Sequence, residues 1–97
     1  MLHILTGSPF QTQSFKHCSV VLEENDAVLL IQDAVIAVMA ENSALDAILK
    51  QRVKIYLLAA DMQARGLAFD ESGHFEVVDY KGFVSLTVKH ETQMKWG

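Results

Sequence analysis

The sequence predicts an α/β domain built on a mainly parallel sheet. Four short runs of aliphatic residues are each followed by turn residues and then by a segment of helical character, an alternation typical of parallel α/β folds. The run from Ala27 to Gln32 is continuous rather than alternating in hydropathy, as expected for a strand covered on both faces. The 97 residues contain no linker, repeat or low-complexity stretch, so we expect one domain over residues 1–97.

The first strand is expected at residues 3–6, because the apolar run there ends at Gly7. The helix after it has two candidate starts. The run Ser8-Pro9-Phe10-Gln11 has the form of a capping box with proline at the first helical position, and Ser14 is a competing cap. Four residues then share one broad apolar face at helical spacing, namely Phe15, Cys18, Val21 and Leu22. The second strand is expected at residues 27–32.

The middle of the chain repeats this pattern. Ser43 and Asp46 form a capping box that opens a second helix. The third strand is expected at residues 54–59, where the run after Lys54 is again continuously apolar. A short turn of helix after Asp61 should end at Arg65-Gly66, because glycine takes the left-handed cap conformation easily.

The last part of the chain is expected to hold a fourth strand, a helix and a tail. The strand at residues 75–79 is weaker than the others because Glu76 interrupts its apolar run, and the helix is expected from about Lys81 to His90. Aromatic and methionine side chains are enriched in interface cores, which makes the end of the chain a candidate partner contact. The three side chains expected there are Phe83, Met94 and Trp96. Trp96 packing back onto its own domain is the alternative.

Composition and charge narrow the classes of function. Hydrophobic residues make up 51% of the chain, which excludes a disordered chain and leaves more apolar surface than a small monomer can hide, so we expect an oligomer. Eight Lys and Arg stand against twelve Asp and Glu, which leaves no footprint for direct binding of nucleic acid. The apolar run at residues 34–40 is too short to span a membrane, and the opening residues lack the form of a secretory signal.

Cys18 is the single cysteine, which excludes an internal disulfide and fits a reducing cytoplasm. Its place on the apolar face of the first helix is typical of a small buried hydrophobe. The functional alternative is a sulfur-carrying thiolate activated near a helix N-terminus. With Ser14 as the cap, however, Cys18 lies about one turn into the helix, where the influence of the dipole fades. The residues alone leave both interpretations open.

Three aspartates fall at the carboxyl edge of the predicted sheet, where ligands collect: Asp33, Asp61 and Asp79. We expect Asp33 and Asp61 to cap the helices that follow them. A metal site is the alternative, but the three lie on separate loops with no histidine beside them. The four histidines show no metal-ligand spacing; they are His3, His17, His74 and His90. Redox, dinucleotide and phosphate-loop motifs are absent as well, so we expect no metal and no cofactor.

Several short motifs recur together along the chain. They are Met1-Leu2-His3, Ser8-Pro9-Phe10, Leu29-Leu30-Ile31-Gln32-Asp33, Asp61 with Ala64-Arg65-Gly66, Asp79-Tyr80, Phe83-Val84, Leu86-Thr87-Val88-Lys89-His90 and Gln93-Met94-Lys95-Trp96-Gly97. Each is weak by itself, but their order and spacing extend over the whole chain, and the closing run makes the combination specific. The sequence resembles the TusB/DsrH family.

The resemblance implies a three-layer DsrE/F/H-like domain, similar to flavodoxin, with four to five strands. It also implies a cytoplasmic heterohexamer of three related subunit types, TusB, TusC and TusD. Such a complex relays persulfide sulfur from TusA towards TusE for 2-thiolation of the wobble uridine in tRNA. The principal sulfur-carrying cysteine there belongs to the TusD-type subunit, so this chain would be an accessory subunit of a sulfurtransferase complex.

The DsrH branch of the family supplies the alternative. In that branch, a DsrEFH complex serves sulfur oxidation, and a cysteine follows the Ser-Pro-Phe motif at a spacing that Cys18 resembles. On this hypothesis Cys18 is a catalytic, sulfur-binding residue. The formal net charge of −4 agrees with either relay, because a subunit that hands sulfur between proteins need not touch nucleic acid itself.

Overall fold

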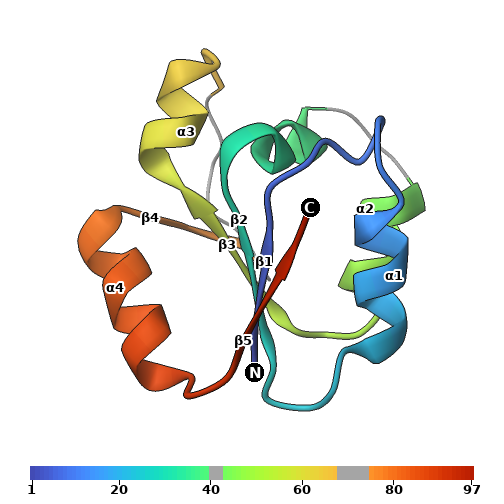
Figure 1. The fold of residues 1–97 in the computed structure, drawn as a ribbon. Coiled ribbons are helices and arrows are strands. Elements are labelled where there is room, and N and C mark those ends of the chain that lie inside the picture. Colours follow the sequence, from blue (N-terminus) through green and yellow to red (C-terminus); the bar gives the residue numbers. More distant parts are fainter. Residues whose placement is uncertain (40–42, 68–74) are drawn as a thin grey trace.

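Five parallel strands form the sheet at the centre of the molecule. The computed structural model describes residues 1–39, 43–67 and 75–97. The strands are β1 (Leu2–Leu5), β2 (Ala27–Leu30), β3 (Lys54–Leu58), β4 (Phe75–Val78) and β5 (Gln93–Trp96). They lie in the order β4-β3-β2-β1-β5, and each neighbouring pair is parallel (Figure 1). The predicted α/β class with a parallel sheet is thus confirmed.

Helices cover both faces of this sheet (Figure 1). They are α1 (Ser14–Val21), the 3-10 helix η1 (Gln32–Val38), α2 (Ser43–Leu49), α3 (Ala59–Ala64) and α4 (Tyr80–Lys89). The helices α1 and α2 lie on one side of the sheet and α4 lies on the other, which gives the expected three layers. Within the described ranges, no helix is both long enough and apolar enough to cross a membrane.

The sheet separates two apolar cores. Successive residues of a strand point to opposite faces. Along β2, Val28 and Leu30 therefore join the larger core, under α1 and α2, while Ala27 and Leu29 join the smaller core, under α4. All four side chains are buried, which explains why this segment is continuously apolar instead of alternating.

The tail beyond α4 forms a strand in addition to the four that the apolar runs predict. β5 pairs with β1, with Leu2 opposite Gln93 and Leu5 opposite Trp96. It is an edge strand, and most of its side chains are exposed. An edge strand buries little surface, so it lacks the apolar run that identifies the inner strands. The total of five agrees with the range of four to five that the family resemblance implies.

Neither of the two predicted serines caps α1. The helix begins at Ser14 with Gln13 at its N-cap position, the Ser14 hydroxyl donates to the Gly97 carbonyl, and Ser8 closes a turn before the helix. The Ser8 side-chain oxygen accepts the backbone N–H of Phe10 at 3.1 Å. The Ser8 carbonyl accepts the N–H groups of Gln11 and Thr12, each at 3.1 Å. The capping-box pattern therefore marks a turn that leads into the helix rather than its first residues.

The start of α3 differs from the prediction. The helix begins at Ala59, directly at the end of β3, so the expectation that it starts after Asp61 is wrong. Its end is as expected, because Gly66 has a φ of 65° and donates its N–H to the Gln63 carbonyl at 3.0 Å. Glycine adopts this left-handed conformation without the steric cost of a side chain.

Candidate functional site

Cys18 lies on the inner face of α1 and is fully buried in the larger core. Burial, and then the negative charge of Asp26, raise the pKa of the Cys18 thiol to about 12. At neutral pH the group is therefore a neutral thiol, whereas the thiolate is the form that attacks or carries sulfur. In this conformation Cys18 occupies the position of a small buried hydrophobe.

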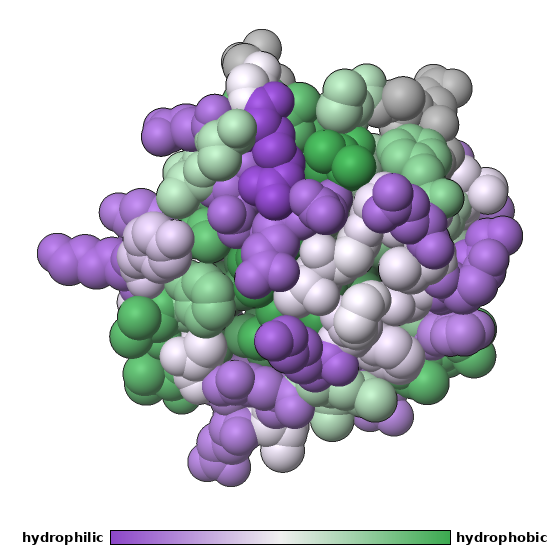
Figure 2. Space-filling model, turned by 45° about the horizontal axis from the view of Figure 1, so that its top comes forward, coloured by the Kyte–Doolittle hydropathy of each residue, from purple (hydrophilic) through white to green (hydrophobic). Residues whose placement is uncertain are grey.

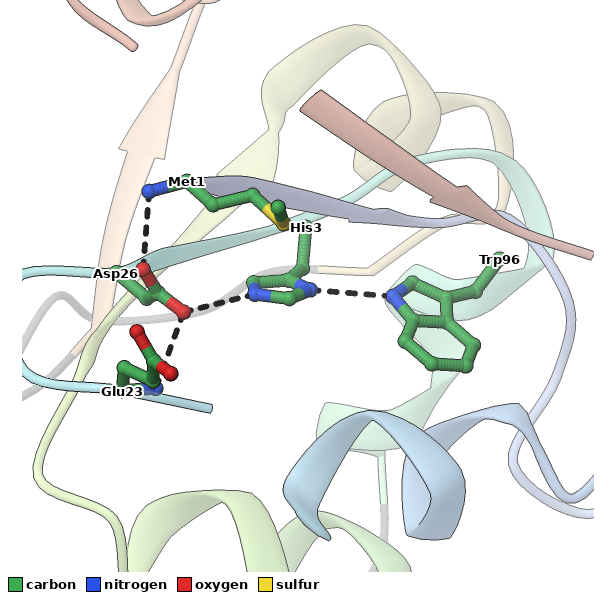
Figure 3. A network of polar contacts seen from close by, with 5 residues as sticks. All are labelled: Met1, His3, Glu23, Asp26 and Trp96. Atoms are coloured by element: carbon green, nitrogen blue, oxygen red, sulfur yellow. Dashed lines mark hydrogen bonds and ion pairs between the residues drawn. The ribbon is translucent and has the colours of Figure 1, made fainter. Parts of the chain in front are cut away.

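A partly buried polar network is centred on β1 (Figure 3), and its Trp96 packs against the larger core, which also holds Cys18. At its centre is His3 of β1, with 1% of its surface exposed. Its Nε2 lies 2.9 Å from Oδ2 of Asp26, in the loop before β2, and its Nδ1 lies 3.2 Å from the indole Nε1 of Trp96 in β5. The network thus joins the first strand of the chain to a loop and to the last strand.

The donors in this network determine the tautomer of His3. An indole nitrogen only donates, so Nδ1 of His3 must accept from Trp96 and carries no proton. The ring proton is on Nε2, which donates to the carboxylate of Asp26. Both ring nitrogens are occupied by partners within the chain. In this arrangement His3 has no free nitrogen with which to bind a metal or take a proton from a substrate.

Asp26 anchors the network at the other end. Its carboxylate accepts hydrogen bonds from the Met1 ammonium at 2.9 Å, from His3, and from the backbone N–H of Glu23 at 3.0 Å. Burial alone would raise the pKa of Asp26, but these hydrogen bonds and the ammonium charge outweigh it and hold the pKa below its ordinary value. The carboxylate is therefore ionised and fully paired (Figure 3).

The sequence pattern does not predict this network. His3 shows no metal-ligand spacing, but a histidine inside an apolar strand is itself a signal, because a buried polar ring needs partners. Those partners, Asp26 and Trp96, lie 23 and 93 residues away along the chain. Motif spacing cannot identify partners at such separations.

A second polar cluster lies at the carboxyl ends of β2 and β3. Oδ2 of Asp61 accepts the backbone N–H of Gln32 at 2.7 Å, and Nη2 of Arg65 pairs with Oδ1 of Asp33 at 2.8 Å. Gln32 has a φ of 51°, a left-handed conformation that Asp61 holds by this bond. Neither aspartate caps the helix after its strand, so the predicted caps at Asp33 and Asp61 are wrong. The carboxylate of Asp33 instead forms an ion pair with the guanidinium of Arg65.

Asp79, the third aspartate of this edge, does cap a helix. Its Oδ1 accepts the N–H of Gly82 at 2.8 Å at the start of α4. Asp33 and Asp61 thus share the guanidinium of Arg65, while Asp79 has a separate partner. Among the described residues, no group of three or more His, Cys, Asp or Glu side chains could hold a metal ion. His74 lies outside those residues.

The three predicted interface residues have different environments. Phe83 is half-buried against the smaller core, and Trp96 is half-buried against the larger one. Met94 keeps 41% of its surface exposed. Trp96 thus packs back onto its own domain, which was the alternative interpretation of the tail. The partner contact through these three side chains stays a prediction, with Met94 the most accessible of them.

A hollow with a volume of about 570 Å³ opens at the amino ends of β2 and β3. Its lining mixes both signs of charge, with Glu23 and Asp26 near Arg52 and Lys54. His90 also lines it, and its pKa is lowered by burial and then by the charges of the N-terminal ammonium and Lys89. A mixed lining of this kind selects neither anions nor cations.

The family relationship rests on the whole chain. A family model described as "DsrH like protein" matches residues 7–93. The chain belongs to the DsrH family. Protein TusB of Buchnera aphidicola subsp. Acyrthosiphon pisum (strain 5A) is 41% identical over 96 residues, and Protein TusB of Escherichia coli (strain K12) is 42% identical over 96 residues. In both cases the match covers 99% of this chain and 100% of the relative.

A solved structure shows the same fold. The ychN protein from E. coli superposes with a TM-score of 0.76 and 16% identity, covering 98% of this DsrH-family chain and 97% of that chain. At that identity the likeness concerns the fold alone. The matches confirm the TusB/DsrH resemblance and the DsrE/F/H-like architecture expected from it.

Proposed function

We propose that this DsrH-family chain is a TusB-like accessory subunit of a cytoplasmic sulfur relay. Its partners would be TusC- and TusD-like subunits in a heterohexamer. That complex would receive persulfide sulfur from a TusA-like carrier and pass it to a TusE-like carrier, for 2-thiolation of the wobble uridine in tRNA. The observation that carries the proposal is the identity of 41% and 42% to proteins named TusB over the full length of each relative.

The state of Cys18 supports an accessory role. It is the single cysteine of the chain, it is fully buried, and its thiol stays protonated at neutral pH. A sulfur carrier needs an accessible thiolate to accept sulfur and an accessible persulfide to release it. A chain whose only thiol lies in the core is better suited to hold partner subunits in position than to carry sulfur itself.

The charge of the chain supports a role in the relay without direct contact with the tRNA. The formal net charge is −4, and no cluster of basic residues is present in the sequence. Neutralising RNA phosphates requires such clusters, and their absence disfavours direct contact. On this proposal the sulfur reaches tRNA through other proteins.

Co-expression with the two related subunits from the same organism tests the proposal. With an affinity tag on the TusD-like subunit, this chain should elute with both partners in one peak at equal stoichiometry. In a strain that lacks its own TusB, the chain should restore 2-thiouridine in tRNA, measured by mass spectrometry of nucleosides, and Cys18→Ala should restore it equally well. A chain that elutes alone and restores no 2-thiouridine contradicts the proposal.

A second candidate is favoured by the match to the DsrH family model and by the presence of Cys18. On this alternative the chain serves a DsrEFH-like complex of sulfur oxidation, and Cys18 binds sulfur. The Cys18 thiolate would attack the outer sulfur of a donor persulfide, whose S–S bond breaks as the donor leaves as a thiolate. The step exchanges one persulfide for another, without net oxidation. It requires α1 to expose Cys18.

Mass spectrometry separates this candidate from the first. Incubation of the assembled complex with a persulfide donor should add about 32 Da, one sulfur atom, to the Cys18 peptide if the residue binds sulfur. Cys18→Ser should then abolish transfer, while Lys16→Gln, on the exposed side of the same helix, should not. An unmodified Cys18 beside a loaded cysteine on a partner subunit excludes the alternative.

A further inference from the structure

The helix α4 carries an apolar row on the face that points away from the sheet. Tyr80, Val84 and Val88 follow one another at intervals of four residues, so they lie along one side of the helix. Their exposed fractions are 64%, 59% and 76%. Figure 2 shows hydrophobic side chains at the left side of the molecule, where α4 lies in Figure 1. The row is a raised apolar strip on an exposed helix.

Exposure to water does not explain why valines occupy the outer face of α4. Valine is a weak helix former, because its branched side chain loses rotamer freedom against the preceding turn. On its inner face, α4 buries Leu86 and half-buries Phe83. Two valines on the outer face therefore weaken a helix that is anchored by few buried side chains. An apolar contact between that outer face and another protein would offset the loss of helix stability that the two valines cause.

A polar row with a lysine at each end runs beside the apolar row. Lys81, Ser85 and Lys89 are also spaced by four residues and are all exposed. Among the described residues, neither lysine ammonium lies within ion-pair distance of a carboxylate. These two positive charges lie near the two ends of the apolar row. A partner surface that covers the row should therefore be apolar in the middle and carry negative charge near each lysine.

Charge argues against an identical α4 as the occupant. In an antiparallel pair, Lys81 of one copy would face Lys89 of the other at both ends of the contact. In a parallel pair, each lysine would face its own counterpart. Either orientation places like charges together, which disfavours the contact. The complementary surface is an apolar helix row with carboxylates at its two ends, eight positions apart.

We propose that the outer face of α4, formed by Tyr80, Val84, Val88, Lys81 and Lys89, docks an amphipathic helix of another protein subunit with Asp or Glu at the two ends of its apolar row. The inference rests on the proposed function, in which the related subunits are the partners, and it names the surface that one of them covers. Apolar helix faces pack by fitting ridges of side chains into grooves, and the flanking charges select the partner.

A pair of single substitutions tests the apolar row. Val88→Gln removes its most exposed member, and Val20→Gln is the matched control, because Val20 is a helical valine with 82% exposure on α1, across the sheet. Val88→Gln should weaken assembly with the co-expressed related subunits at least about tenfold, measured by analytical ultracentrifugation. Val20→Gln should assemble like the wild type. Thermal melts should show both variants folded. Wild-type assembly by Val88→Gln overturns the inference.

The charge-reversed variant Lys81→Glu/Lys89→Glu tests the electrostatic part. It should weaken the same assembly at least about tenfold, and added salt should weaken the wild-type assembly more than that of the variant. Equal assembly by the variant and the wild type at low salt contradicts the charge requirement and overturns the inference.

The same variant separates failure of the inference from failure of the proposed function. If the wild-type chain does not assemble with the related subunits, the proposed function fails. The charge-reversed chain then serves as the probe, because it presents the same apolar row with carboxylates at both ends. Mixed with isotope-labelled wild type, it should shift NMR signals of α4 and leave those of α1 in place. A mixture without shifts on α4 overturns the inference as well.

Discussion

The indole N–H of Trp96 donates to Nδ1 of His3 across 3.2 Å, between two residues that are 93 positions apart. Because Nε2 of the same ring donates to Asp26, one imidazole holds the last strand, the first strand and the loop before β2 together. All three bonding groups are at least partly buried. Loss of any one of them would leave a polar atom in the interior without a partner.

Trp96→Phe is expected to lower the free energy of unfolding by about 1–3 kcal/mol, because Nδ1 of His3 loses its donor while an aromatic ring is kept. Urea denaturation measures the difference. Lys95→Gln, at the neighbouring exposed position of β5, is the control and should change stability little. Equal stability of the two variants would show that the indole bond contributes nothing.

Asp26→Asn is expected to remove a pH-dependent part of the stability. The pKa of Asp26 is lower in the folded protein than its ordinary value of 3.8, so its contribution is complete above that value and is lost as the pH falls through the folded pKa. Urea denaturation of wild type and variant should therefore give a difference of about 1–3 kcal/mol at pH 7 that shrinks below about pH 4. A difference that persists unchanged at pH 2 argues against the ionised network.

Cys18 is expected to resist iodoacetamide in the folded protein at pH 8 and to react rapidly in urea, because it is buried and its thiol stays protonated. The folded pKa of about 12 lies above the ordinary 9.0, so the thiol's contribution is complete below the ordinary value and is lost as the pH rises through the folded pKa. Stability should fall between about pH 9 and 12 in the wild type and less in Cys18→Ala. Rapid alkylation of the folded chain would show that α1 opens.

Gln32→Gly is expected to stabilise the chain by up to about 1 kcal/mol, because a φ of 51° suits glycine better than glutamine and the bond from the backbone N–H to Asp61 remains. Gln63→Gly, inside α3, is the opposite control and should cost about 1 kcal/mol. Thermal melts compare the two. A destabilised Gln32→Gly would indicate that the glutamine side chain makes a contribution larger than the backbone strain.

The parts of the fold that sequence can predict are those that local burial determines. β2 is buried on both faces, and β3 is buried or half-buried along its length, so apolar residues fill most positions and the runs are visible. β5 has no such run, because it is an edge strand with two polar residues among four. Its identity as a strand depends on β1, which lies at the other end of the chain.

The candidate site is predicted less well, because most of its contacts join residues that are distant in the sequence. Cys18 is correctly expected on the apolar face of α1, because helical spacing is local. The predicted caps at Asp33 and Asp61 fail because Arg65 and the N–H of Gln32 compete for those carboxylates. Which donor wins depends on how η1 and α3 meet in space, and a pattern within one segment does not contain that information.

Because β1 lies between β2 and β5, its two neighbours in the sheet are synthesised at very different times. β1 gains β2 as a neighbour early in synthesis, but its other side stays open until β5 has been synthesised. An open strand edge is a template for pairing with other chains, and pairing between distant segments is slow. During most of its synthesis the nascent chain therefore exposes an unpaired edge of β1, which can pair with other chains. Once β5 has been made and pairs with β1, that edge is covered.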